Sequence, residues 1–100
     1  MALFDKALNS VDIEQGLELD PECAGVLPRL GRGQMMDLLV TDGRKVLKFL
    51  YSLTAGSPPK PKFSGGWIEF ARNLKPGNKV YFYGEEDEAT GAQYRVVVRG

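Results

Sequence analysis

The sequence contains no histidine and a single cysteine, Cys23. Without histidine the chain can form neither a His-based catalytic triad nor a histidine-containing zinc site, and one cysteine can form neither an internal disulfide nor a cysteine-rich metal site. The acidic residues fall in no spacing that corresponds to a catalytic carboxylate pair. We therefore expect no enzymatic activity, no cofactor and no bound metal. Cys23 is expected to pack as a small hydrophobic side chain.

Long hydrophobic runs are also absent. No apolar segment approaches the length that a transmembrane helix needs, and the amino terminus lacks the basic and then hydrophobic pattern of a signal peptide. The chain has 100 residues, of which 43% are hydrophobic and 26% are charged, a composition typical of an ordinary soluble globular protein. We expect residues 1–100 to form one intracellular domain with no membrane partner.

The formal net charge is zero, but the charges are unevenly distributed along the chain. Residues 1–24 carry a net charge of −5, residues 25–80 carry +7 and residues 81–100 carry −2. A middle segment with this excess of lysine and arginine can present a basic face on a neutral molecule. Alternatively, the charges interleave on folding and cancel locally. The acidic run 85–88 is expected to be a solvated hairpin tip.

The clearest helical pattern follows Gly65 and Gly66. Four apolar residues recur at the spacing of one helix face, namely Trp67, Phe70, Ala71 and Leu74. The two glycines predict a sharp turn before this helix, and Pro76-Gly77 predicts a type II turn after it. A second short helix is expected after Asp20-Pro21, with the Asp20 carboxylate as its cap.

Most of the remaining chain alternates as strands do. Strands are expected at residues 2–8, 17–19, 34–41, 44–51, 62–63, 79–83 and 94–99, and Asp42-Gly43 is a strong hairpin signal. About seven strands and two short helices with no long crossovers predict an all-β fold, a small antiparallel barrel. Residues 52–59, with the sequence SLTAGSPP, are expected to form a loop. With Lys60 and Lys62 after it, this loop is either a projecting arm that reaches phosphates and base edges or a solvated connection.

These patterns together resemble the plant B3 DNA-binding domain. The helix and strand in residues 63–83, FSGGWIEFARNLKPGNKVYFY, resemble the family's Gly-Trp helix and the strand after it. LNSVDI at 8–13, LELDPECA at 17–24 and DGRKVLKFLY at 42–51 resemble further B3 segments in the same order along the chain. The resemblance implies a seven-stranded open pseudobarrel with two short helices.

The resemblance also implies a function and a set of residues. B3 domains are plant transcription-factor modules in the nucleus that grip the major groove of double-stranded DNA with two arms. The first arm here is expected at Asn9–Gly16, with Asn9 and Ser10 as contacts. The second is expected at Ser52–Lys60 with support from the preceding strand, and its candidate contacts are Lys48, Ser52, Thr54, Ser57, Lys60 and Lys62. Lysines bind phosphates, while short polar side chains read base edges.

An alternative reading follows from the near-neutral charge and the acidic first 24 residues. A B3-like domain of this charge can act as a protein interaction module with little or no affinity for DNA. Its partner would then bind the surface formed by Asn9–Glu18. DNA binding that weakens with salt distinguishes the first hypothesis from this one.

Overall fold

The computed structural model describes residues 1–43 and 45–100. In chain order, its elements are β1 (Phe4–Ala7), α1 (Ser10–Glu14), β2 (Leu17–Glu18), the 3-10 helix η1 (Pro21–Val26), β3 (Met35–Asp42), β4 (Lys45–Leu53), β5 (Pro61–Gly65), α2 (Gly66–Ala71), β6 (Lys79–Gly84) and β7 (Tyr94–Arg99). No helix within these described ranges combines the length and the hydrophobicity that crossing a membrane requires.

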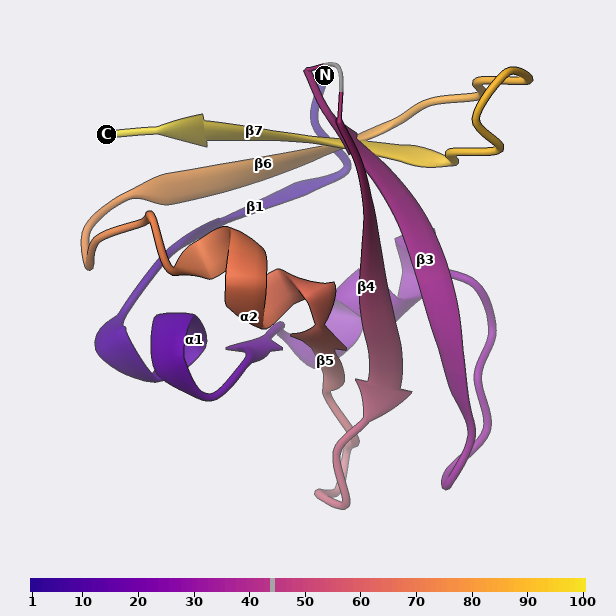
Figure 1. Ribbon diagram of the computed structural model, residues 1–100. Coiled ribbons are helices and arrows are strands. Elements are labelled where there is room, and N and C mark those ends of the chain that lie inside the picture. The colour runs from indigo at the N-terminus through magenta and orange to yellow at the C-terminus, as the bar shows by residue number, and fades with distance from the viewer. Residues whose placement is uncertain (44) are drawn as a thin grey trace.

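The seven strands form one strongly curled sheet in the order β1-β6-β7-β3-β4-β5-β2. Figure 1 shows β1, β6 and β7 running across one end of β3 and β4, with α2 on the concave side. The predicted all-β class and seven-stranded open pseudobarrel are therefore confirmed. The expectation of a purely antiparallel barrel is wrong, because β3 and β7 pair in parallel through Val40 with Tyr94 and Thr41 with Arg95. This pair joins the two halves of the sheet.

Aromatic side chains fill the core between the halves of the sheet and α2. Trp67, Phe49, Phe63 and Phe82 are all at most 1% exposed. The Phe49 ring meets the Trp67 indole edge to face, with centroids 5.5 Å apart. This arrangement stabilises an aromatic pair in addition to the effect of burying its surface. The expected helix face is confirmed for Trp67, Phe70 and Ala71, of which Trp67 and Ala71 are buried. Leu74 does not belong to it as expected, because α2 ends at Ala71 and Leu74 packs against the core from the turn that follows.

The two glycines at the start of α2 allow the chain to turn closely against β4. Gly65 has a φ of 63°, a conformation that favours glycine. A Cβ added to Gly66 would lie 2.3 Å from the carbonyl oxygen of Lys48. The predicted sharp turn is thus confirmed, and it positions α2 directly on the strand that carries Lys48. The predicted Pro76-Gly77 turn is also present, closed by the Asn78 N–H donating to the Lys75 carbonyl at 3.0 Å.

The helices near the amino terminus differ from the sequence expectations. A helix, α1, occupies much of the expected first arm, so the described residues contain three short helical segments, one more than expected. The segment after Asp20 is a 3-10 helix, and the Asp20 side chain makes no capping hydrogen bond. Short 3-10 segments of this kind commonly connect other elements. Cys23 in this helix is half-buried against the core, and burial, with Asp20 and Glu22 adding to it, raises the pKa of its thiol. That environment agrees with the expected packing role.

Candidate nucleic-acid interface

Three of the predicted DNA contacts lie on the outer face of the β4–β5 sheet. Phe49 and Tyr51 of β4 are buried, so the alternating residues Lys48 and Ser52 face away from the core. Ser52 lies opposite Lys62 of β5 in the antiparallel register. Strand alternation therefore brings these two lysines and a hydroxyl onto one surface.

The β4–β5 loop continues this surface beyond the ends of the strands. At its neck the Thr54 N–H donates to the Lys60 carbonyl and the Lys60 N–H donates to Thr54 Oγ1, both at 2.9 Å. Residues 55–58, which include Ser57, are exposed, and so is Lys60. Figure 1 shows the loop projecting past β4 and β5. The second arm is thus a closed loop that begins at Thr54; the expected start at Ser52 is wrong, because Ser52 and Leu53 continue β4.

The first arm is built on α1 and is ordered by a reciprocal cap. The Asn9 Oδ1 accepts from the Asp12 N–H at 2.8 Å, and the Asp12 Oδ2 accepts from the Asn9 N–H at 3.1 Å. This capping box explains why Asn9 starts a helix here. Ser10, the first residue of α1, is exposed, whereas the side-chain oxygen of Asn9 is already occupied by the cap.

Asp12, one of the two acids of the first arm, is removed from the surface by folding. It is 2% exposed, and its Oδ1 accepts a hydrogen bond from Lys6 Nζ at 2.8 Å, which makes an ion pair between β1 and α1. The Trp67 Nε1–H donates to the backbone carbonyl of Asp12 at 2.8 Å and ties α1 to α2. Glu14 is the acid of this arm that remains exposed.

Gly16 brings the two arms together. Its φ is 123°, and a Cβ added to it would lie 2.9 Å from Lys62 Cε and 3.0 Å from the Phe63 carbonyl oxygen. The aliphatic part of Lys62 therefore lies across the end of the first arm. This close approach places a lysine from the second arm's supporting strand beside the first arm, and a larger residue at position 16 would displace it.

The charges on this face are mixed but not neutralised in pairs. Two ion pairs are found among the described residues, Lys6 with Asp12 and Lys79 with Asp5, and neither involves Lys48, Lys60 or Lys62. Glu18 lies opposite Lys62 across the β2–β5 pair, and Asp37 of β3 lies opposite Leu50 of β4. The surface is thus a lysine-bearing face with acidic residues along its edges.

Ser64 is a polar residue of this face that sequence reasoning did not select. It lies opposite Leu50 in the β4–β5 register, two residues after Lys62. The alternation of Lys62, Phe63 and Ser64 around the buried Phe63 was the signal that could have identified it. Likewise, the spacing of Asn9 and Asp12 was the signal for the capping box that organises the first arm.

Several solved structures resemble this fold, including two from Arabidopsis. The Arabidopsis FUS3–DNA complex matches with a TM-score of 0.79 at 21% sequence identity, over 100% of this chain and 98% of that one. A hypothetical protein of Arabidopsis thaliana matches with a TM-score of 0.65 at 18% identity, over 97% of this chain and 88% of that one. No protein-family model and no curated protein sequence matches the chain. At these identities the likenesses show the fold.

Proposed function

We propose that this chain, which has the fold of the B3 domain, is a single domain that binds double-stranded DNA in a sequence-specific manner. Its first arm, Asn9–Gly16, and its second arm, Thr54–Lys60, enter the major groove from two sides of the outer β4–β5 face. The observation that carries the proposal is the placement of three lysines on one projecting loop and the outer face of its supporting strands, outside the ion pairs of the described residues; they are Lys48, Lys60 and Lys62.

The chemistry of this surface suits a duplex. Lysine ammonium groups bind phosphates without reading sequence, and they give the protein its position on the DNA. Hydroxyl groups of Ser10, Ser52, Ser57 and Ser64 are short donors and acceptors that can reach base edges, where each base pair presents a distinct pattern. The likeness to FUS3, which was solved as a complex with DNA, supports this assignment.

Burial of Asp12 removes one of the two acids of the first arm from the surface that would face DNA. An exposed acid on this arm would repel phosphates, but Asp12 is paired with Lys6 inside the fold. One acid, Glu14, then faces solvent on the arm, and Lys62 lies across the arm's end. From the likeness to the FUS3–DNA complex, we also propose a role in nuclear transcription regulation and no enzymatic activity.

Selection from a random pool of duplexes at low salt tests the proposal. We expect one sequence to be enriched and its affinity to fall steeply with salt, as counterion release requires. Lys60→Ala should weaken binding about equally for all sequences and lower the salt slope by about 1. Lys79→Ala is the matched control, because Lys79 of β6 is paired with Asp5 of β1 in the other half of the sheet. Absence of binding at low salt would exclude the function.

A protein interaction module is the second candidate, favoured by the acids on the same face. Glu18 and Asp37 lie on the outer surface with Lys62 and Lys48, and the net charge is zero. A partner that binds Asn9–Glu18 and excludes duplex would support this candidate. The same duplex selection separates the two functions.

A further inference from the structure

The carboxyl-terminal half of β7 is a strand with one open edge. Along its whole length β7 pairs with β6, from Tyr94 opposite Gly84 to Arg99 opposite Lys79. On its other side it pairs with β3, but only at Tyr94 and Arg95. Among the residues that the structure describes, the stretch from Val96 to Arg99 therefore has β6 as its only strand neighbour. An unpaired edge of this kind is a template for another extended chain.

The hydrogen-bond parity of the sheet shows which backbone groups face that edge. The Leu8 N–H donates to the Asn78 carbonyl at 2.8 Å, and the Glu85 N–H donates to the Gln93 carbonyl at 2.9 Å. Even-numbered residues of β6 thus bond to β1, and odd-numbered residues bond to β7. By the register, Arg95, Val97 and Arg99 use their backbone groups toward β6. The N–H and C=O of Val98 point to the open edge.

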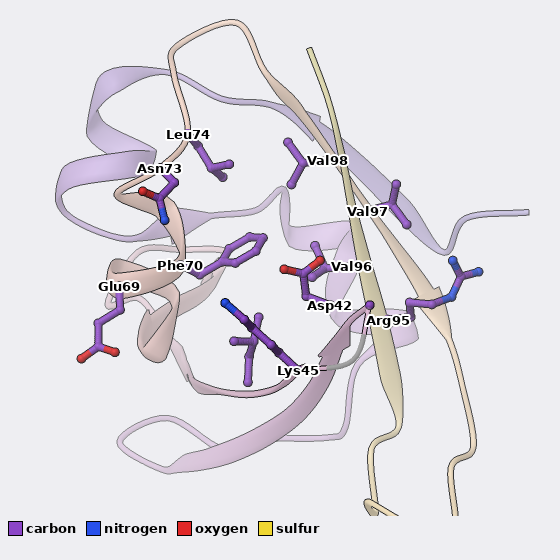
Figure 2. Close-up of a pocket in the computed structure, with 12 residues that line it drawn as sticks. Asp42, Lys45, Glu69, Phe70, Asn73, Leu74, Arg95, Val96, Val97 and Val98 are labelled. Atoms are coloured by element: carbon purple, nitrogen blue, oxygen red, sulfur yellow. The ribbon is translucent and has the colours of Figure 1, made fainter.

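A groove with an apolar floor runs beside this edge. It has a volume of about 720 Å³ and lies between β7, the start of β4 and the end of α2. Figure 2 shows Phe70 and Leu74 pointing across it toward Val96 and Val98. Phe70, Leu74, Leu47 and Val98 are half-buried, so their outer surfaces remain available. These side chains can receive apolar residues of a segment that lies along β7.

The opposite face of the same strand is cationic. Arg95 and Arg99 are exposed and project outward, where the Arg95 guanidinium lies 4.5 Å from the Tyr83 ring centroid and the Arg99 guanidinium lies 6.0 Å from that of Tyr81. Stacking on the tyrosines holds the two arginines along β7. Outward residues of an added strand would lie beside these arginines, where acidic side chains are favoured.

We propose that the open edge of β7 binds an extended peptide of a partner protein in which apolar residues alternate with Asp or Glu. The peptide adds a strand to β7, bonds to the backbone of Val98, places its apolar side chains against Phe70, Leu74 and Val98, and places its carboxylates beside Arg95 and Arg99. The edge from Val96 to Arg99 is about 13 Å long at the usual rise of a strand, which suits about four residues of partner. This site is separate from the two DNA arms.

Amide chemical-shift mapping of the full chain with a synthetic hexapeptide of alternating valine and glutamate tests the proposal. We expect saturable shifts at Val96, Val98 and the end of α2, with the Val98 amide protected from exchange only when peptide is present. A peptide of the same composition with three valines followed by three glutamates should bind at least about tenfold more weakly. As a strand it cannot place all its valines on one face and all its glutamates on the other.

Two further hexapeptides test strand pairing itself, one N-methylated at its valines and one at its glutamates. Alternate amides of a strand point to opposite edges, so one methylated peptide should lose binding and the other should keep it. Equal binding of the two methylated peptides overturns the proposal. So does protection of the Val98 amide in a dimer of the free chain, since a second copy would then cover the edge.

Charge reversal at Arg95 supplies a variant that should leave the core intact. Arg95→Glu should lower the affinity for the valine–glutamate peptide about tenfold. It should raise the affinity for a peptide in which valine alternates with lysine. Arg32→Glu, an exposed change in the turn before β3, should leave both affinities unchanged. Lys60→Ala should also leave them unchanged, which separates this site from the DNA interface. Identical behaviour of Arg95→Glu and Arg32→Glu overturns the proposal.

Discussion

The indole of Trp67 donates a hydrogen bond from Nε1 to the backbone carbonyl of Asp12, at 2.8 Å. Trp67 is fully buried on α2, and Asp12 is the buried acid of α1. The bond therefore connects the central helix of the core directly to the first arm. Because Asp12 also caps α1 and pairs with Lys6, the conformation of the arm depends on groups that lie beneath it and not on its exposed residues.

Trp67→Phe should loosen the first arm more than the sheet. The change removes the hydrogen bond and leaves a cavity, and together these should lower the free energy of unfolding by roughly 2–4 kcal/mol. Urea unfolding measures this loss, and hydrogen exchange should show faster opening of α1 amides than of β4 amides. Tyr83→Phe, a change on the outer face, should alter neither. Uniform acceleration of exchange in both elements would contradict the proposed tie.

The two acids of the first arm should behave differently when neutralised. Glu14 is exposed, so Glu14→Gln should raise affinity for duplex DNA about two- to fivefold at low salt by removing repulsion. Asp12→Asn breaks the buried pair with Lys6 and should lower the free energy of unfolding by roughly 2–4 kcal/mol without raising affinity. Paired titrations and urea unfolding distinguish them. Stronger DNA binding by folded Asp12→Asn would show that the carboxylate faces the DNA.

The sequence predicted the seven strands, the helix face of Trp67 and the turns around α2, because each depends on local periodicity and on glycine or proline. It did not predict the parallel pairing of β3 and β7, which depends on how the two halves of the sheet close and not on any local pattern. In the candidate site, the projecting loop followed from its composition. The burial of Asp12 could not be predicted from the sequence, because the tertiary fold brings its partner Lys6 to it.

Thr54→Val should weaken DNA binding without weakening the fold. Its hydroxyl accepts the Lys60 N–H that closes the neck of the second arm, and water can replace that acceptor at this exposed site. The free energy of unfolding should change by less than about 1 kcal/mol, while a less ordered loop should lose about two- to fivefold in affinity. Thr54→Ser keeps the acceptor and should restore affinity. If valine and serine variants bind equally, the neck does not order the arm.

Gly66 and Gly25 form a matched pair for the close approach of α2 to β4. Gly66→Ala would bring a Cβ within 2.3 Å of the Lys48 carbonyl oxygen, so the backbone must shift, and we expect a loss of roughly 2–4 kcal/mol in the free energy of unfolding. Gly25→Ala meets nothing within 4 Å and should change it by less than about 1 kcal/mol. Denaturant titrations compare the two. Equal stability of both variants would place α2 farther from β4 than the structure does.

Alkaline pH should destabilise the fold through two core tyrosines. Burial raises the pKa of Tyr51, with Tyr94 adding to it, and burial also raises the pKa of Tyr94. The folded state therefore favours the neutral phenols. Their contribution to stability is complete below the pKa of an unfolded tyrosine, about 10, and is lost as the pH rises through the higher folded pKa values.

Urea unfolding between about pH 8 and pH 11 should therefore show a free energy of unfolding that declines above about pH 10. Tyr51→Phe combined with Tyr94→Phe should flatten that decline, because these two sites would no longer release protons on unfolding. Tyr81→Phe, which removes a hydroxyl from the outer face, is the control and should keep it. An equally steep decline in the double variant would assign the alkaline instability to other groups and remove the two core phenols as its cause.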